Sequence, residues 1–107
     1  MSSIAIIPAR GGSKRIPHKN IRDFLGEPII SYPIAVALDS KLFDEVMVST
    51  DDKEIASIAQ SHGATVPFLR SVETSSDTAT TLSVILEVLS NYEKQNKHFE
   101  YVCCLYP

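Results

Sequence analysis

Hydrophobic residues follow two patterns that alternate along this chain. Continuous apolar runs occur at residues 4–8, 45–50, 64–69 and 101–105, and short runs of this kind predict buried strands. Between the runs, apolar residues recur at helical spacing. The three helices expected there carry apolar faces formed by Ile29, Ile30, Ile34, Val36, Ala37 and Leu38, by Ile55, Ile58 and Ala59, and by Leu82, Ile85, Leu86 and Leu89.

Residues that favour helix ends separate these elements. Pro28 can open the first helix, Asp51 or Asp52 can cap the second, and Gly63 can close it. The pair Asp77-Thr78 can cap the third helix. The alternation of strand and helix predicts an α/β fold, a Rossmann-like parallel sheet with helices on both faces. Such sheets bind ligands in the crevice outside the carboxyl ends of their strands.

The composition is that of an ordinary globular protein. The chain has 107 residues, 44% hydrophobic and 21% charged, so it can form one modest core and represents one domain or a piece of one. Its formal net charge of −3 is too small to suggest a nucleic-acid partner. Residues 1–22, however, contain five basic side chains and no acidic one. This local positive charge in an acidic chain predicts an anionic ligand.

Cys103 and Cys104 are adjacent within the apolar run 101–105. Neighbours in a strand point to opposite faces, so we expect two buried free thiols in a reducing compartment and no disulfide between them. Residues 1–4 do not begin a signal peptide, and no window approaches the roughly 18 apolar residues of a membrane span. We therefore expect a cytoplasmic protein with no membrane partner.

The basic residues lie in a glycine-containing stretch directly after the first expected strand. Gly11-Gly12 allows the backbone to approach a ligand closely, and successive backbone N–H groups in such a turn suit phosphate oxygens. Arg10 can bind phosphate bidentately, while Lys14 and Lys19 can act as point charges. A solvated basic loop is the alternative, although it would not require the absence of acidic residues. The stretch contains neither the P-loop pattern nor the dinucleotide fingerprint.

The stretch from Ile7 to Pro17, followed by Lys19-Asn20, resembles the signature of the sialic-acid-type cytidylyltransferases. The resemblance continues over essentially the whole chain, at residues 25–29, 48–52, 68–70, 77–81 and 103–107. It implies a nucleotide-diphospho-sugar transferase fold and an enzyme that couples CTP to a nine-carbon acidic sugar and releases pyrophosphate. Residues 66–70 and the Cys-Cys strand look most like the pseudaminic acid branch of the family.

The nucleotide-binding residues that this resemblance implies are Arg10, Gly11, Gly12, Ser13, Lys14, Lys19, Asn20, Arg70, Asp77 and Thr81. The first five correspond to the loop that wraps the triphosphate, and the next two lie near the α-phosphate. Arg70 and Thr81 correspond to positions near the cytosine and ribose. Arg10 and Lys19 are the residues expected to act in catalysis. A divalent metal ion, Mg²⁺, would share the phosphate charge, with its carboxylate ligands in a segment outside residues 1–107.

The residues themselves leave alternatives open. Asp51 and Asp52 could bind a metal at the end of their strand, although capping of the following helix is favoured. Arg70 could instead form a surface ion pair. The acceptor sugar could be N-acetylneuraminic, legionaminic or 3-deoxy-octulosonic acid, and the chain could also be a non-catalytic CTP-binding fragment.

Members of the resembled family are longer than this chain. We therefore expect residues 1–107 to be the amino-terminal nucleotide-binding portion of a single cytidylyltransferase domain, incomplete here. The sugar site, the metal ligands and a homodimer interface would lie in the remainder. The strand expected at residues 101–105 should then be left partly uncovered, with exposed apolar area.

Overall fold

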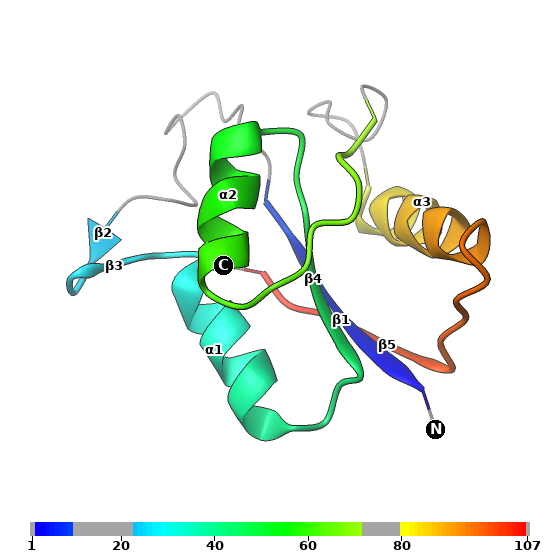
Figure 1. The fold of residues 1–107 in the computed structure, drawn as a ribbon, viewed down its shortest axis with the longest axis horizontal. Coiled ribbons are helices and arrows are strands. Elements are labelled where there is room, and N and C mark those ends of the chain that lie inside the picture. Colours follow the sequence, from blue (N-terminus) through cyan, green and yellow to red (C-terminus); the bar gives the residue numbers. More distant parts are fainter. Residues whose placement is uncertain (1, 10–22, 72–79, 107) are drawn as a thin grey trace.

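The computed structural model describes residues 2–9, 23–71 and 80–106, which form a parallel sheet between two layers of helices (Figure 1). The sheet has the order β4-β1-β5, from β4 (Glu45–Ser49), β1 (Ser3–Pro8) and β5 (Tyr101–Cys104). Helices α1 (Ser31–Ser40) and α2 (Lys53–Ser61) lie on one side of the sheet, and α3 (Thr81–Glu93) lies on the other (Figure 1). The predicted parallel sheet with helices on both faces is thus confirmed.

The central strand, β1, is buried on both of its faces. Ile4 and Ile6 are fully buried in one cluster with Val88 and Tyr92 of α3. The intervening side chains of β1 belong to the opposite cluster, together with α1 and α2, whose buried members are Ala5, Ile7, Ala9, Ile30, Ile34, Ala37, Val46, Val48, Ile55, Ala59 and Ala64. Because successive side chains of a strand point to opposite faces, one apolar run supplies both cores.

The strand expected at residues 64–69 is reduced to a single parallel bridge between Thr65 and Met47. The Thr65 N–H donates to the carbonyl of Val46 at 2.9 Å, and the Val48 N–H donates to the carbonyl of Thr65 at 3.0 Å. The next donor in this ladder would be residue 67, which is a proline and has no N–H. Pairing therefore stops after one bridge, beside the outer edge of β4.

The helix expected to open at Pro28 begins at Ser31 instead. Pro28 lies in β3 (Glu27–Pro28), which pairs with β2 (Asp23–Phe24) in a small antiparallel hairpin. Leu25 and Gly26 between the two strands both have positive φ, as two-residue hairpin turns favour. The expected apolar face of this helix is also partly wrong, since Val36 is largely exposed while Ile34 and Ala37 are buried.

Helix α2 begins and ends where the sequence predicted. Of the two candidate caps, Asp52 is the one used, and its Oδ1 accepts from the N–H groups of Glu54 at 2.8 Å and Ile55 at 3.2 Å. After the helix, Gly63 has φ +100°, and its N–H donates to the carbonyl of Gln60. A Cβ at this glycine would lie 2.9 Å from Cδ1 of Leu38. Gly63 is therefore required both by the left-handed backbone and by the close packing.

Helix α3 presents a different face to the sheet from the one predicted. Val84, Val88 and Tyr92 are buried, whereas Leu82 and Leu86 are 64% and 56% exposed. Both sets recur at helical spacing, so the periodicity alone does not decide between them. The expected cap, Asp77-Thr78, lies outside the described residues, and the helix begins after Thr80 with a capping box between Thr80 and Ser83.

Strand β5 is an outer strand of the described sheet and is partly uncovered, as expected. Tyr101 is 55% exposed and Val102 is 38% exposed. Cys103 and Cys104 are free thiols, as predicted, but they are half-buried and not fully buried. Among the helices of the described residues, none combines the length and the apolar character needed to cross a bilayer.

The cap of α2 leads to a stability prediction. Asp52→Ala removes the acceptor for two helix N–H groups, so we expect the free energy of unfolding of the full-length protein to fall by about 1 kcal/mol. Asp52→Asn keeps an acceptor oxygen and should change it by much less. Urea unfolding of the three proteins measures both values. An equal loss in both variants would mean that the negative charge, and not the cap hydrogen bonds, carries the stabilisation.

Candidate functional site

The carboxyl ends of all three strands lie along one edge of the sheet. The N–H of Ala9, just after β1, donates to the carbonyl of Ser49 at the end of β4, at 2.8 Å. The N–H of Leu105, just after β5, donates to the carbonyl of Ile6 at 2.9 Å. Since β1 has β4 on one side and β5 on the other, the connections change direction at β1. Ligands of open α/β sheets bind at such a switch point, so this edge is the candidate site.

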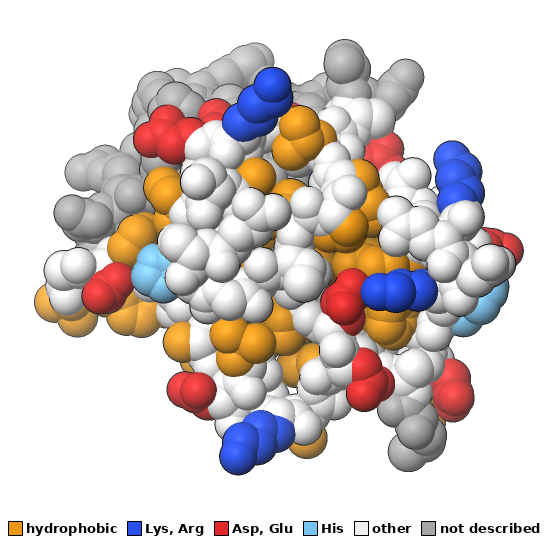
Figure 2. All heavy atoms as spheres, viewed as in Figure 1, with side chains coloured by type: hydrophobic (Ala, Val, Ile, Leu, Met, Phe, Trp, Pro, Cys, Tyr) orange, Lys and Arg blue, Asp and Glu red, His pale blue; other side chains and the backbone are white. Residues whose placement is uncertain are grey.

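The basic stretch enters this edge directly from β1, because Ala9 is the last described residue before it. Most of the predicted nucleotide-binding residues lie outside the described residues: Arg10, Gly11, Gly12, Ser13, Lys14, Lys19, Asn20 and Asp77. Their roles stay predictions. On the face shown in Figure 2, the Lys and Arg side chains of the described residues lie apart from one another. The concentration of positive charge is therefore a property of the sequence between residues 10 and 22.

Arg70, one of the two predicted site residues that the structure describes, lies beside the end of β4. Its N–H donates to the carbonyl of Thr50 at 2.8 Å, and Thr50 is fully buried just after β4. The side chain of Arg70 is half-buried, with a buried Nε atom. A guanidinium held at the carboxyl edge in this way is available to an anionic or polar ligand there.

The residue after Arg70 connects this segment to α3. The N–H and the hydroxyl of Ser71 both donate to the carboxylate of Glu87, the former at 3.1 Å. Glu87 lies six residues after Thr81, which corresponds to about 9 Å along the helix axis. Arg70 is thus anchored beside the same helix that carries Thr81, the other described site residue.

Thr81 is the first residue of α3, and its Oγ1 contacts the hydroxyl of Tyr106. Tyr106 lies two residues after β5, so this contact brings the start of α3 to the carboxyl end of β5, next to the switch point. Tyr106 was not among the predicted site residues. Its place directly behind the apolar run 101–105 was the signal in the sequence, because residues that follow a parallel strand lie at the ligand edge.

The chemistry of Tyr106 extends to a neighbouring thiol. Burial raises the pKa of the Cys104 thiol, a hydrogen bond with the Tyr106 side chain opposes that rise, and the nearby Cys103 adds to it. The Cys104 thiol therefore stays protonated at neutral pH and is a poor nucleophile. This agrees with a structural role for the cysteines.

Acidic residues at the site edge do not form a metal centre among the residues that the structure describes. Asp52 uses Oδ1 to cap α2, which favours the capping interpretation of the pair Asp51-Asp52. No group of three or more His, Cys, Asp or Glu side chains suited to a metal ion occurs in the described ranges. The described residues thus do not fit a divalent ion by themselves, and the chemistry below uses none.

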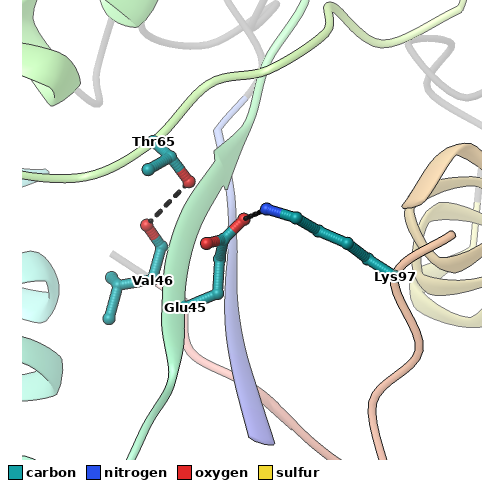
Figure 3. A network of polar contacts seen from close by, with 4 residues as sticks. All are labelled: Glu45, Val46, Thr65 and Lys97. Carbon is teal, nitrogen blue, oxygen red and sulfur yellow. Dashed lines mark hydrogen bonds and ion pairs between the residues drawn. The ribbon is translucent and has the colours of Figure 1, made fainter. Parts of the chain in front are cut away.

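A second polar group lies at the opposite, amino end of β4 (Figure 3). The Nζ of Lys97 lies 3.9 Å from Oε2 of Glu45, and the hydroxyl of Thr65 donates to the carbonyl of Val46 at 3.3 Å. Burial raises the pKa of the nearby Tyr92 hydroxyl, its interaction with Glu45 adds to the rise, and that with Thr65 opposes it. These contacts stabilise the end of the sheet that is remote from the candidate site.

Comparison with known proteins connects this geometry to a family. Residues 4–106 match the family described as cytidylyltransferase. The chain is 51% identical over 106 residues to a pseudaminic acid cytidylyltransferase of Campylobacter jejuni, covering 99% of this chain and 46% of that protein. It is 41% identical over 107 residues to a CMP-N,N'-diacetyllegionaminic acid synthase of Legionella pneumophila, covering 100% of this chain and 46% of that protein.

A solved structure agrees with the fold. The structure of a CMP:2-keto-3-deoxy-manno-octonic acid synthetase complexed with CTP superposes with a TM-score of 0.80 at 25% sequence identity, covering 99% of this chain and 40% of that one. The predicted nucleotide-diphospho-sugar transferase fold is thereby confirmed. The chain spans about half the length of the curated relatives it matches. With a family match over residues 4–106 and a fold shared with a CTP-bound synthetase, the chain belongs to the cytidylyltransferase family.

Proposed function

We propose that the full-length protein carrying this chain transfers the CMP group of CTP to a nine-carbon acidic sugar, with pseudaminic acid as the acceptor, and releases pyrophosphate. The observation that carries the proposal is the 51% identity to a pseudaminic acid cytidylyltransferase over 99% of the chain. The site geometry supports it, since the glycine-containing basic stretch leaves β1 at the ligand edge of the sheet.

The reaction is a nucleotidyl transfer at phosphorus. The anomeric hydroxyl oxygen of the sugar attacks the α-phosphorus of CTP and loses its proton. The new oxygen–phosphorus bond forms as the bond to the β-phosphate oxygen breaks, and pyrophosphate leaves with that oxygen. Such transfers need little covalent chemistry from the protein. Positioning of the two substrates and stabilisation of developing charge on the phosphates do most of the work.

The roles of the residues follow from the resemblance and the edge geometry together. Backbone N–H groups at Gly11-Gly12 would bind the triphosphate, and Arg10 and Lys19 would stabilise the charge that develops in the transition state. Arg70 and Thr81, both at the carboxyl edge, would contact the cytosine and ribose. Residues from three separate segments would therefore surround one nucleotide.

The choice of sugar is the finer part of the proposal. Two relatives named as pseudaminic acid cytidylyltransferases are 51% and 48% identical to this chain, compared with 41% for the Legionella protein named for the legionaminic acid derivative. These values favour pseudaminic acid over N-acetylneuraminic, legionaminic and 3-deoxy-octulosonic acids. A cytoplasmic homodimer that uses Mg²⁺, with metal ligands outside residues 1–107, completes the proposal.

An assay of pyrophosphate release tests this function directly. The full-length protein is supplied with CTP, UTP, ATP or GTP and with each of the four acidic sugars. We expect turnover with CTP and the highest kcat/KM with pseudaminic acid, because a pocket built for cytosine leaves polar groups unpaired with other bases. Equal turnover with ATP would remove the cytidylyltransferase proposal. CTP binding without pyrophosphate release would favour a non-catalytic nucleotide-binding protein.

Substitutions in the basic stretch test the residues. Arg10→Ala and Lys19→Ala should each lower kcat/KM by roughly 100-fold, as expected for the loss of one preorganised contact to the transition state. Arg22→Ala is the matched control, since it removes a positive charge outside the family signature and should change kcat/KM little. Steady-state kinetics with CTP and the preferred sugar measures all three. Small and equal effects would identify the stretch as a solvated surface loop.

A further inference from the structure

Thr81 and Tyr106 form a pair of hydroxyl groups at the edge of the sheet. They are 25 residues apart in the sequence, one at the first position of α3 and the other just after β5, and their oxygens are in contact. Tyr106 is 60% exposed and Thr81 is also exposed, so a ligand at the switch point can reach both. The pair is the described contact that joins α3 to the carboxyl end of β5 through side-chain hydroxyls.

The position of the Tyr106 phenol is itself well defined. Leu105, the preceding residue, is bound through its N–H to the carbonyl of Ile6 in the central strand. The phenol also interacts with the Cys104 side chain on β5. Tyr106 is therefore attached to the most buried part of the sheet, and it can transmit that fixed position to the Thr81 hydroxyl.

Helix α3 does not need this contact in order to begin. The N–H of Ser83 donates to Oγ1 of Thr80 at 3.0 Å, and the N–H of Thr80 donates to the hydroxyl of Ser83 at 3.1 Å. This capping box already satisfies the first turn. A contact between two exposed hydroxyls competes with water and adds little to stability. The Thr81–Tyr106 contact thus has no evident structural necessity, although it fixes the orientation of a predicted nucleotide-binding side chain.

We propose that Tyr106 is a positioning residue for the nucleotide site, whose phenol holds the Thr81 hydroxyl in the orientation that contacts CTP. The inference rests on the proposed function, because it takes Thr81 to be a nucleotide contact. Hydroxyl groups both donate and accept, which suits the ribose hydroxyls and the cytosine edge. With its rotamer fixed before binding, the Thr81 side chain loses less entropy when the nucleotide arrives.

Four variants of the full-length protein test the pair. Tyr106→Phe keeps the ring and removes the hydroxyl, and Thr81→Val removes the Thr hydroxyl at constant shape. We expect each to raise the Kd for CTP alone and the KM for CTP roughly tenfold, as for the loss of one ligand hydrogen bond, with kcat within about twofold of the parent. Thr81→Ser keeps the hydroxyl and should stay close to the parent. The double variant should also show roughly a tenfold increase and not a hundredfold one, because the two residues act as a unit.

Tyr101→Phe is the matched control, because Tyr101 is an exposed tyrosine at the amino end of the same strand, away from the site edge. It should leave the CTP affinity unchanged. Isothermal calorimetry gives the Kd, steady-state assays give the KM for each substrate, and thermal melting shows whether any variant is unstable. A purely structural role would lower the melting temperature of Tyr106→Phe without a specific effect on CTP, and this result would overturn the proposal.

The remaining outcomes separate this inference from the proposed function. If the parent protein releases no pyrophosphate from CTP with any of the acidic sugars and does not bind CTP, the proposed function fails and the inference fails with it. If the parent is active and Tyr106→Phe behaves like Tyr101→Phe, the inference alone is wrong. A raised KM for the sugar with an unchanged Kd for CTP would overturn the assignment to the nucleotide. Fully additive effects in the double variant would overturn the coupling between Tyr106 and Thr81.

Discussion

The rest of the structure depends on the burial of β1 on both faces. Ile4, Ile6 and Ile7 have no exposed surface, and each buried side chain of this size contributes about 1.5–3 kcal/mol to the hydrophobic stabilisation. The backbone of β1 is bonded to β4 on one side and to β5 on the other. No other described strand has both edges paired with strands of the sheet. Any shift of β1 would therefore disturb both cores and both ladders at once.

This constraint has a direct functional consequence. The basic, glycine-containing stretch begins immediately after β1, so its first residues leave from the most firmly held point of the sheet. Phosphate groups are bound by several donors that must converge within tenths of an ångström, and such precision is easier to reach when the loop starts from a rigid support. Sequence placed the positive charge in this stretch, and the structure explains why that is the place where it can act.

The agreement between sequence and structure follows from how local each determinant is. The apolar runs of β1, β4 and β5, the cap at Asp52 and the turn at Gly63 depend on neighbouring residues, and the sequence predicted all of them. The errors concern which partner an element meets. Helix α3 has two apolar stripes, and only the shape of the sheet surface selects Val84 and Val88 over Leu82 and Leu86. Likewise, Pro28 can open a helix or end a hairpin strand, and the local pattern does not decide.

The same distinction explains what could be known of the site. Motif residues are contiguous in the chain, so the stretch after β1 was recognisable without coordinates. Tyr106 became a site residue only when the parallel sheet brought the end of β5 to the start of α3, across 25 residues of sequence. Arg70 reaches the same edge through its bond to Thr50 and the anchoring of Ser71 to α3. A site assembled in this way depends on strand order more than on any single motif. Its weakest point is therefore the contact between elements that the sheet holds at a distance, and the Thr81–Tyr106 pair is such a contact.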